Sequence, residues 1–117
     1  MTPLTSKRYL VVATPVFQLT LKKLCAFIKR KHDGRIAVSA RDSIKQRVAE
    51  LAVDPNLAPV SDRLEALGIT DYRQLLVDQH NLVFYRVDER AGKVILILAM
   101  DTRQSVKQLL YEINISL

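Results

Sequence analysis

The sequence predicts an α+β fold, in the order β-α-α-β-β-β-α, with an antiparallel sheet and a two-helix hairpin packed on one face of it. Three observations predict this fold. A short strand-like run near the start precedes two stretches in which apolar residues have helical spacing. Three further apolar runs, at residues 72–77, 82–88 and 93–100, are separated by polar breaks of a few residues, as in an antiparallel meander. A last helical pattern then closes the chain.

The first strand is predicted at residues 9–13, YLVVA, because this run is compact and partly β-branched. Thr14 and Pro15 follow it, and these residues suit the N-cap and the first position of a helix. Apolar residues then recur at spacings of four, three and four and define one helix face: Phe17, Leu21, Leu24 and Ile28. The helix is expected to end near residues 32–34.

A second helix is predicted from about residue 36 to residue 53, where residues 54–56, DPN, end it. Its apolar face is expected to consist of Ala37, Ala40, Ile44, Val48 and Leu51. Because the break between the helices is short, they should form an antiparallel hairpin that covers one face of the sheet. Residues 57–71 are less regular. They allow either an ordered loop or one helical turn capped by Asp62 and ended by Gly68.

The run at residues 94–100, VILILAM, has no polar residue at alternate positions, so both faces of this strand must be covered. The helical hairpin can supply one layer. The second layer requires either the closing helix or another polypeptide, and the sequence leaves both open. The closing helix is expected to be capped at Asp101-Thr102 and to bury four apolar side chains: Val106, Leu109, Leu110 and Ile113.

The chain of 117 residues is expected to form one domain, residues 1–117. Its net charge of +6 is unevenly distributed: residues 1–50 have eleven Lys or Arg and three acids, whereas residues 51–117 have seven and nine. A basic first half suits an anionic partner, which would be nucleic acid or an acidic peptide. The ordinary alternative is a solvated helix face.

The composition predicts no cofactor and no metal site. Cys25 is the single cysteine and lies in an apolar helical pattern, so a buried structural role is favoured over a nucleophilic one. The two histidines, His32 and His80, lack the spacing of metal ligands. No signal peptide or bilayer-length apolar run is present, so we expect a cytoplasmic location and no membrane partner.

Two motifs carry a resemblance to a known family. Residues 72–77, YRQLLV, followed by residues 83–88, VFYRVD, are similar to the central hairpin of the RelE/ParE superfamily of bacterial toxins. Residues 94–98 followed by DTRQ at 101–104 resemble its last strand and the segment after it, and the resemblance extends over nearly the whole chain. It implies a RelE/ParE-like fold and a growth-inhibiting toxin of a type II toxin-antitoxin module, of the kind associated with plasmid stabilization. A cognate antitoxin protein would neutralise the toxin, and operator DNA would be contacted only through the antitoxin.

The family divides by target, and the resemblance therefore implies two alternatives. RelE-like members are ribosome-dependent mRNA endonucleases, whereas ParE-like members inhibit DNA gyrase without being hydrolases. A metal-independent endoribonuclease needs a base, an acid and several cations at close range. The candidate catalytic cations, if the chain is a nuclease, are Arg73, Arg86 and Arg103, which are expected to converge on one face of the sheet. For Arg73 and Arg86, the alternative is a structural role, in which each pairs with Asp71 or Asp88 across the hairpin.

Three departures from the nuclease pattern favour the gyrase alternative. Asn81 stands where the resemblance would place a basic residue, and Met100 stands where many relatives have His. The C-terminal residues 111–117 offer only Tyr111 where the family's nucleases commonly have a Tyr or His. Under either alternative, the expected target-binding residues are Lys29, Arg30, Lys31, Asp101, Arg103 and Gln104.

Overall fold

The computed structural model describes residues 8–116. Its elements are β1 (Leu10–Ala13), α1 (Pro15–Lys31), α2 (Gly34–Ala49), a 3-10 turn η2 (Glu50–Ala52), α3 (Asp62–Glu65), β2 (Arg73–Leu76), β3 (Asn81–Asp88), β4 (Lys93–Asp101) and α4 (Val106–Ser116). The predicted α+β fold and order of elements are confirmed, with the short helix α3 added between the hairpin and the meander. None of the helices within the described residues combines the length and hydropathy needed to span a bilayer.

The four strands form one sheet in the order β1-β4-β3-β2. Strands β2, β3 and β4 make the predicted antiparallel meander. Strand β1 pairs with β4 in the parallel direction, from Leu10 opposite Lys93 to Ala13 opposite Leu96. The sheet is therefore mixed, and the expectation of an antiparallel sheet holds for three strands only. A long connection between β1 and β4 in sequence permits either direction, so local patterns do not determine it.

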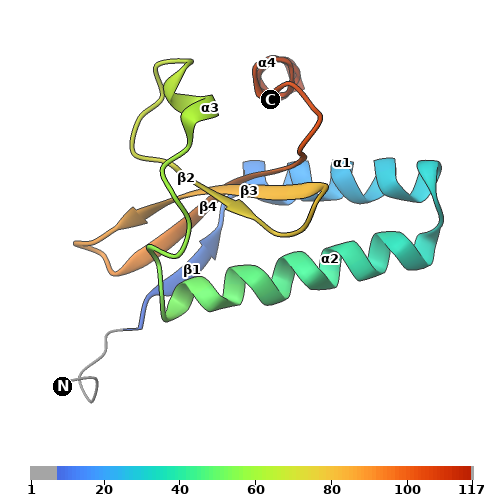
Figure 1. Cartoon of the computed structure of the whole chain (residues 1–117). Coiled ribbons are helices and arrows are strands. Elements are labelled where there is room, and N and C mark those ends of the chain that lie inside the picture. The colour runs from blue at the N-terminus through green and yellow to red at the C-terminus, as the bar shows by residue number, and fades with distance from the viewer. Residues whose placement is uncertain (1–7, 117) are drawn as a thin grey trace.

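Helices α1 and α2 form the predicted hairpin and lie on one side of the sheet (Figure 1). Thr14 caps α1: its Oγ1 accepts a hydrogen bond from Phe17 N at 3.1 Å and donates one to Leu96 O at 2.8 Å. Helix α1 ends at Lys31, as predicted, and Asp33 then caps α2 by accepting from Ile36 N at 3.0 Å. The caps thus fix both the hairpin turn and the attachment of α1 to β4.

The second face of the sheet is covered by α3 and α4, which lie on the side opposite the hairpin (Figure 1). On this side the core consists of Leu64, Leu82, Phe84, Leu98, Met100, Val106, Leu109 and Ile113. The closing helix therefore supplies the second layer that the apolar strand requires, and a partner is not needed to cover β4.

A β-bulge reverses which residues of β4 face each layer. Phe84 pairs with Leu98 but its neighbour Tyr85 pairs with Leu96, so Ile97 is an extra residue in β4. Before the bulge, the even-numbered residues of β4 pack toward the helical hairpin; after it, Leu98 packs toward α4. The sequence pattern predicted a two-sided strand but not this reversal.

Two predicted caps are each displaced along the chain. Ser61, not Asp62, caps α3, and its Oγ accepts from Leu64 N at 3.2 Å. Ser105, rather than Asp101-Thr102, caps α4 by accepting from Gln108 N at 3.1 Å. Ser, Thr and Asp side chains can all cap a helix, so the sequence alone does not choose among them. For α4, the path of the chain after β4 places Ser105 at the cap position. Gly68, predicted as a stop signal, follows α3 with a φ of 80°.

Candidate functional site

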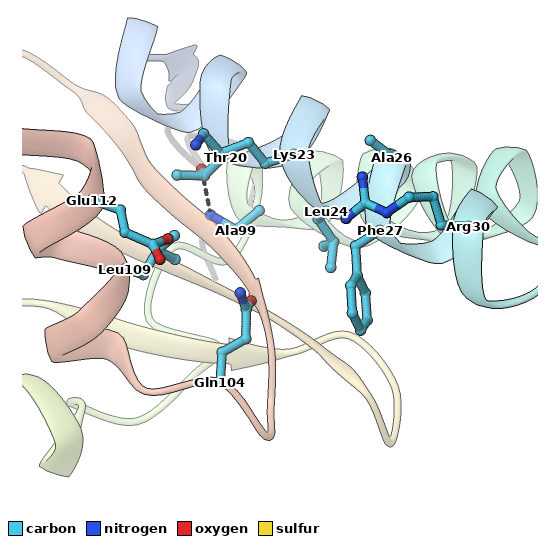
Figure 2. Close-up of a pocket in the computed structure, with 10 residues that line it drawn as sticks. All are labelled: Thr20, Lys23, Leu24, Ala26, Phe27, Arg30, Ala99, Gln104, Leu109 and Glu112. Carbon is cyan, nitrogen blue, oxygen red and sulfur yellow. Dashed lines mark hydrogen bonds between the residues drawn. The ribbon is translucent and has the colours of Figure 1, made fainter. Parts of the chain in front are cut away.

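A groove of about 300 Å³ lies between α1 and α4, above β4. We call it the α1–α4 groove, and its lining residues are Thr20, Lys23, Leu24, Ala26, Phe27, Arg30, Ala99, Gln104, Leu109 and Glu112. Figure 2 shows the basic side chains on α1 facing across the groove from Leu109 and Glu112 of α4. At its floor, Ala99 N donates to Thr20 Oγ1 at 3.0 Å, which joins α1 to β4. The groove therefore has a fixed floor, one basic wall and one wall formed by α4.

A second pocket, of about 290 Å³, lies at the closed end of the helical hairpin, next to the turn that joins α1 and α2. We call it the hairpin pocket, and its lining residues are Phe27, Ile28, His32, Ile36, Ser39, Ala40, Ser43, Asp78, His80, Asn81, Asp101 and Arg103. Phe27 lines both cavities, so the α1–α4 groove and the hairpin pocket are neighbours. Both of the chain's histidines line the hairpin pocket, although they are 48 residues apart in the sequence.

The turn after β4 holds a charged side chain rigidly at this end of the sheet. Asp101 Oδ1 accepts from Arg103 N at 2.8 Å and from Arg103 Nε at 2.9 Å, and its Oδ2 accepts from Nη2 at 2.8 Å. Gln104 Oε1 accepts from Asp101 N at 2.9 Å. Asp101 is buried, whereas the Arg103 side chain is 67% exposed. The guanidinium is therefore fixed by one bidentate partner and presents its other edge to solvent.

This ion pair shifts both ionisation equilibria. Hydrogen bonding to Arg103 holds the pKa of Asp101 below its usual value despite burial, and the nearby His80 contributes in the same direction. The carboxylate in turn raises the pKa of Arg103. Both groups are thus charged over the physiological pH range.

The loop between β2 and β3 is built around one carboxylate. Asp78 Oδ1 accepts from His80 N at 2.8 Å, from Asn81 N at 2.9 Å and from Asn81 Nδ2 at 3.1 Å. Asn81 is 5% exposed, and its Oδ1 has no hydrogen-bond partner among the residues that the structure describes. Thr102 N donates to His80 O at 2.8 Å, which ties this loop to the turn after β4. The two loops therefore form one connected wall of the hairpin pocket.

The structure brings the predicted target-binding residues to one end of the molecule. Arg30 and Gln104 line the α1–α4 groove, and Asp101 and Arg103 line the hairpin pocket. Lys29, Arg30 and Lys31 form the exposed last turn of α1, where the Lys31 ammonium lies 6.0 Å from the centroid of the Phe27 ring.

The three candidate catalytic arginines do not converge, which corrects the sequence-based expectation. Arg73 is paired with Tyr85 and lies on the face of the sheet toward the hairpin, whereas Arg86, the next residue after Tyr85, points to the other face. Both border an open hollow of about 630 Å³. Arg103 follows the strand end where Asn81 pairs with Asp101, at the opposite end of β3.

Arg73 has a structural partner that the sequence did not indicate. Its Nη1 donates to Ala58 O at 2.6 Å, and no ion pair with Asp71 or Asp88 is present among the described residues. Cys25 is half-buried, and burial raises the pKa of its thiol, which agrees with the structural role predicted for it.

Sequence reasoning missed the main residues of the hairpin pocket, namely Phe27, His32, His80 and Asn81. His32 and His80 are far apart in the sequence and lack the spacing of metal ligands, so their proximity becomes visible only in the folded chain. Within residues 8–116, no group of three or more His, Cys, Asp or Glu side chains is arranged to hold a metal ion.

No protein-family model matches the sequence, and no curated protein matches it in sequence. Among solved structures, the chain is similar to a chain of the toxin-antitoxin complex RelBE2 from Mycobacterium tuberculosis, with a TM-score of 0.56 and 16% identity. The match covers 84% of this chain and 95% of that chain. The class that this comparison defines is a RelE-like α+β fold, so the resemblance to RelE/ParE toxins is confirmed at the level of the fold.

Proposed function

We propose that the chain is the toxin of a type II toxin-antitoxin module, that it arrests bacterial growth, and that a cognate antitoxin neutralises it by binding. The observation that carries the proposal is the shared fold with a chain of the RelBE2 toxin-antitoxin complex, aligned over 84% of this chain. The cytoplasm is the proposed location, because growth arrest by this class requires access to gyrase or ribosomes. The single-domain organisation of residues 1–117 is part of the same proposal.

The α1–α4 groove is the proposed contact surface for the antitoxin. Lys23 and Arg30 line it from α1, and neither forms an ion pair with any residue that the structure describes. Leu24 and Phe27 provide apolar contacts between them. A segment that alternates acidic and apolar side chains would match this wall, and a flexible acidic chain that folds on binding has that composition.

The charge of this wall can be tested directly. The double substitution Lys23→Glu and Arg30→Glu should weaken antitoxin binding at least about tenfold, equivalent to about 1.4 kcal/mol, because like charges would face each other. The matched control is Lys45→Glu on α2, an exposed residue outside the groove. Isothermal titration calorimetry with the product of a neighbouring acidic reading frame measures both. Equal affinities for the two variants would exclude the groove as the antitoxin surface.

We propose DNA gyrase as the molecular target. The support is that Arg73, Arg86 and Arg103, the cations expected for nuclease chemistry, do not form one site. The proposed contact residues are Arg103 and Gln104 together with the basic end of α1 at Lys29, Arg30 and Lys31. A non-enzymatic inhibitor needs such a surface but needs no acid and base.

A ribosome-dependent mRNA endonuclease is the second candidate, and the hairpin pocket favours it. His32 and His80 line this pocket together with the fixed guanidinium of Arg103. Histidines can act as acid and base near neutral pH, and a guanidinium can stabilise a pentacovalent phosphate. Under this candidate the catalytic groups would be the histidines and Arg103, whereas Arg73 would have a structural role.

The deciding experiment is pulse labelling of DNA and protein synthesis within minutes of inducing the chain in bacteria that lack an antitoxin. Under the gyrase proposal, DNA synthesis falls first, and purified chain inhibits supercoiling by gyrase. If protein synthesis falls first and cut transcripts appear, the endonuclease candidate replaces it. Unimpaired growth at high expression would refute the toxin proposal itself.

A further inference from the structure

The turn after β4 is tied to two other parts of the chain through a single residue, Thr102. Its N donates to His80 O at 2.8 Å and its Oγ1 donates to Gln79 O at 3.1 Å, so both of its donors bind the loop between β2 and β3. Its carbonyl oxygen accepts from Arg63 Nη2 of α3 at 2.7 Å. Every polar group of Thr102 therefore has a partner outside the turn.

Arg63 is bonded to this turn and not to a carboxylate. It is half-buried and forms no ion pair with any residue that the structure describes, although Asp62 and Glu65 belong to the same helix. Among the described residues, it is the only side chain from another segment that bonds to residues 101–104. A hydrogen bond from a guanidinium is stronger than one between neutral groups, so this contact is a firm one.

The bond from Arg63 fixes the peptide unit that leads into Arg103. Thr102 O and Arg103 N belong to one planar peptide unit, and they point in opposite directions because the bond is trans. Arg63 holds the oxygen, and Asp101 Oδ1 holds the N–H at 2.8 Å. A planar unit that is held at both polar ends cannot rotate about the chain. The direction in which the Arg103 side chain leaves the backbone is thereby set.

Asp101 alone does not fix this direction relative to the rest of the protein. Asp101, Arg103 and Gln104 bond to one another within the same short turn, so these bonds determine its shape. Asp101 is also the last residue of β4 that pairs with β3. Beyond it, the contacts of Thr102 place the turn on the protein. The exposed guanidinium is therefore held in shape by Asp101 and in position by Arg63 and the β2–β3 loop.

Helix α3 is a fixed base for the contact. Leu64 is buried in the core on the α4 side of the sheet, and Ser61 N donates to Tyr72 O at 2.8 Å. Ser61 Oγ also accepts from Leu64 N at 3.2 Å and donates to Gln74 Oε1 at 3.0 Å. None of these contacts involves the side chain of Arg63, so removal of its guanidinium leaves α3 attached.

We propose that Arg63 is a positioning residue for Arg103: by holding Thr102 O, it sets the direction in which the Arg103 guanidinium is presented to the target. Arg63 lines neither the α1–α4 groove nor the hairpin pocket, so it acts through Arg103. The position of this guanidinium is a property of the fold, whereas its use against a target rests on the proposed function. The two are therefore tested separately.

Hydrogen exchange in the purified full chain tests the positioning. Arg63→Met retains the apolar stem but removes the donor, and it should speed exchange of the Arg103 amide at least about tenfold. Arg63→Lys retains one cationic donor and should recover part of the protection. The matched control is Lys107→Met, which removes an equal charge from an exposed position of α4 and should change nothing. The Ala99 amide, bonded to Thr20 Oγ1, reports any change in overall stability. Equal exchange of the Arg103 amide in Arg63→Met and Lys107→Met would overturn the proposal.

Growth arrest at graded expression, in bacteria that lack an antitoxin, tests the use of this position. Arg63→Met should raise the amount of chain needed for arrest at least about fivefold, because a displaced guanidinium loses its contact geometry. Arg103→Met should raise it as much, and Arg63→Lys less. Equal arrest by the wild type and Arg63→Met would overturn the proposal. Lost arrest with unchanged exchange would also overturn it, because Arg63 would then contact the target itself. If the wild type never arrests growth, the toxin proposal fails, while exchange still decides whether Arg63 positions Arg103.

Discussion

Tyr85→Phe tests whether the hydroxyl of Tyr85 stabilises the segment that connects α2 to the antiparallel meander. Tyr85 is fully buried, and its hydroxyl donates to Pro55 O at 2.7 Å and accepts from Ala58 N at 3.4 Å. Burial raises the pKa of this phenol, so the group is a neutral donor throughout the physiological range. The substitution removes one oxygen, adds no atom, and leaves Pro55 O buried without its partner.

The expected loss is about 2 kcal/mol, the usual cost of a lost hydrogen bond that leaves a buried group unsatisfied. Unfolding entropy of about 2.1 cal/mol/K per residue gives about 0.25 kcal/mol/K for this chain, so Tm should fall by about 8 °C. Calorimetry measures the change, and hydrogen exchange should show faster exchange of the Ala58 amide.

The matched control is Tyr111→Phe, which makes the same chemical change at a residue that is 62% exposed. It should change the free energy of unfolding by less than about 0.5 kcal/mol. Equal melting temperatures for the two variants would refute the role assigned to the Tyr85 hydroxyl.

Three further outcomes are expected. Arg73→Ala should lower Tm, because it removes the donor to Ala58 O; a purely catalytic arginine would leave Tm unchanged. Since the pKa of Asp101 is lowered in the folded chain, its contribution to stability is complete above its unfolded pKa, about 3.9, and is lost as pH falls through the folded value. Urea unfolding from about pH 5 to pH 2.5 should therefore show a steeper loss for the wild type than for Asp101→Asn. Gly34 is the first residue of α2, and a Cβ added there would meet no atom within 4 Å, so Gly34→Ala should raise the free energy of unfolding by about 0.5 kcal/mol. Gly68 has a φ of 80°, so Gly68→Ala should lower the free energy of unfolding by about 1 kcal/mol.

The sequence predicts the elements of this fold well because their signals are local. Thr14 and Pro15 define the start of α1, and the apolar spacing from Phe17 to Ile28 defines its buried face. The direction of β1 and the bulge at Ile97 are not local properties. They arise from the pairing of strands that are distant in sequence, and the alternation of apolar residues is the same with or without the bulge.

The positions of the candidate site residues could be predicted only in part from the sequence, and their roles stay predictions. Residues 101–104 and the end of α1 were identified from the sequence, and the structure places them at one end of the molecule. The expected convergence of the three arginines was wrong: Arg73 and Arg86 border the same hollow, whereas Arg103 follows the end of β4 that pairs with Asn81, at the other end of β3. The proximity of His32 and His80 depends on the packing of the hairpin over the β2–β3 loop. Residue spacing in the sequence carries no information about this long-range contact.

The bulge at Ile97 has a consequence for how this sequence can change over time. The segment with Val94 and Leu96 packs with the helical hairpin, and the segment with Leu98 and Met100 packs with α4. Volume changes at Val94, Leu96 or Ala99 must be compensated within the core of α1 and α2, whereas changes at Leu98 or Met100 must be compensated on the side of α3 and α4. Covariation among related chains should therefore link the even-numbered residues of β4 with the helical hairpin before residue 97 and with α4 after it, although β4 is a single strand.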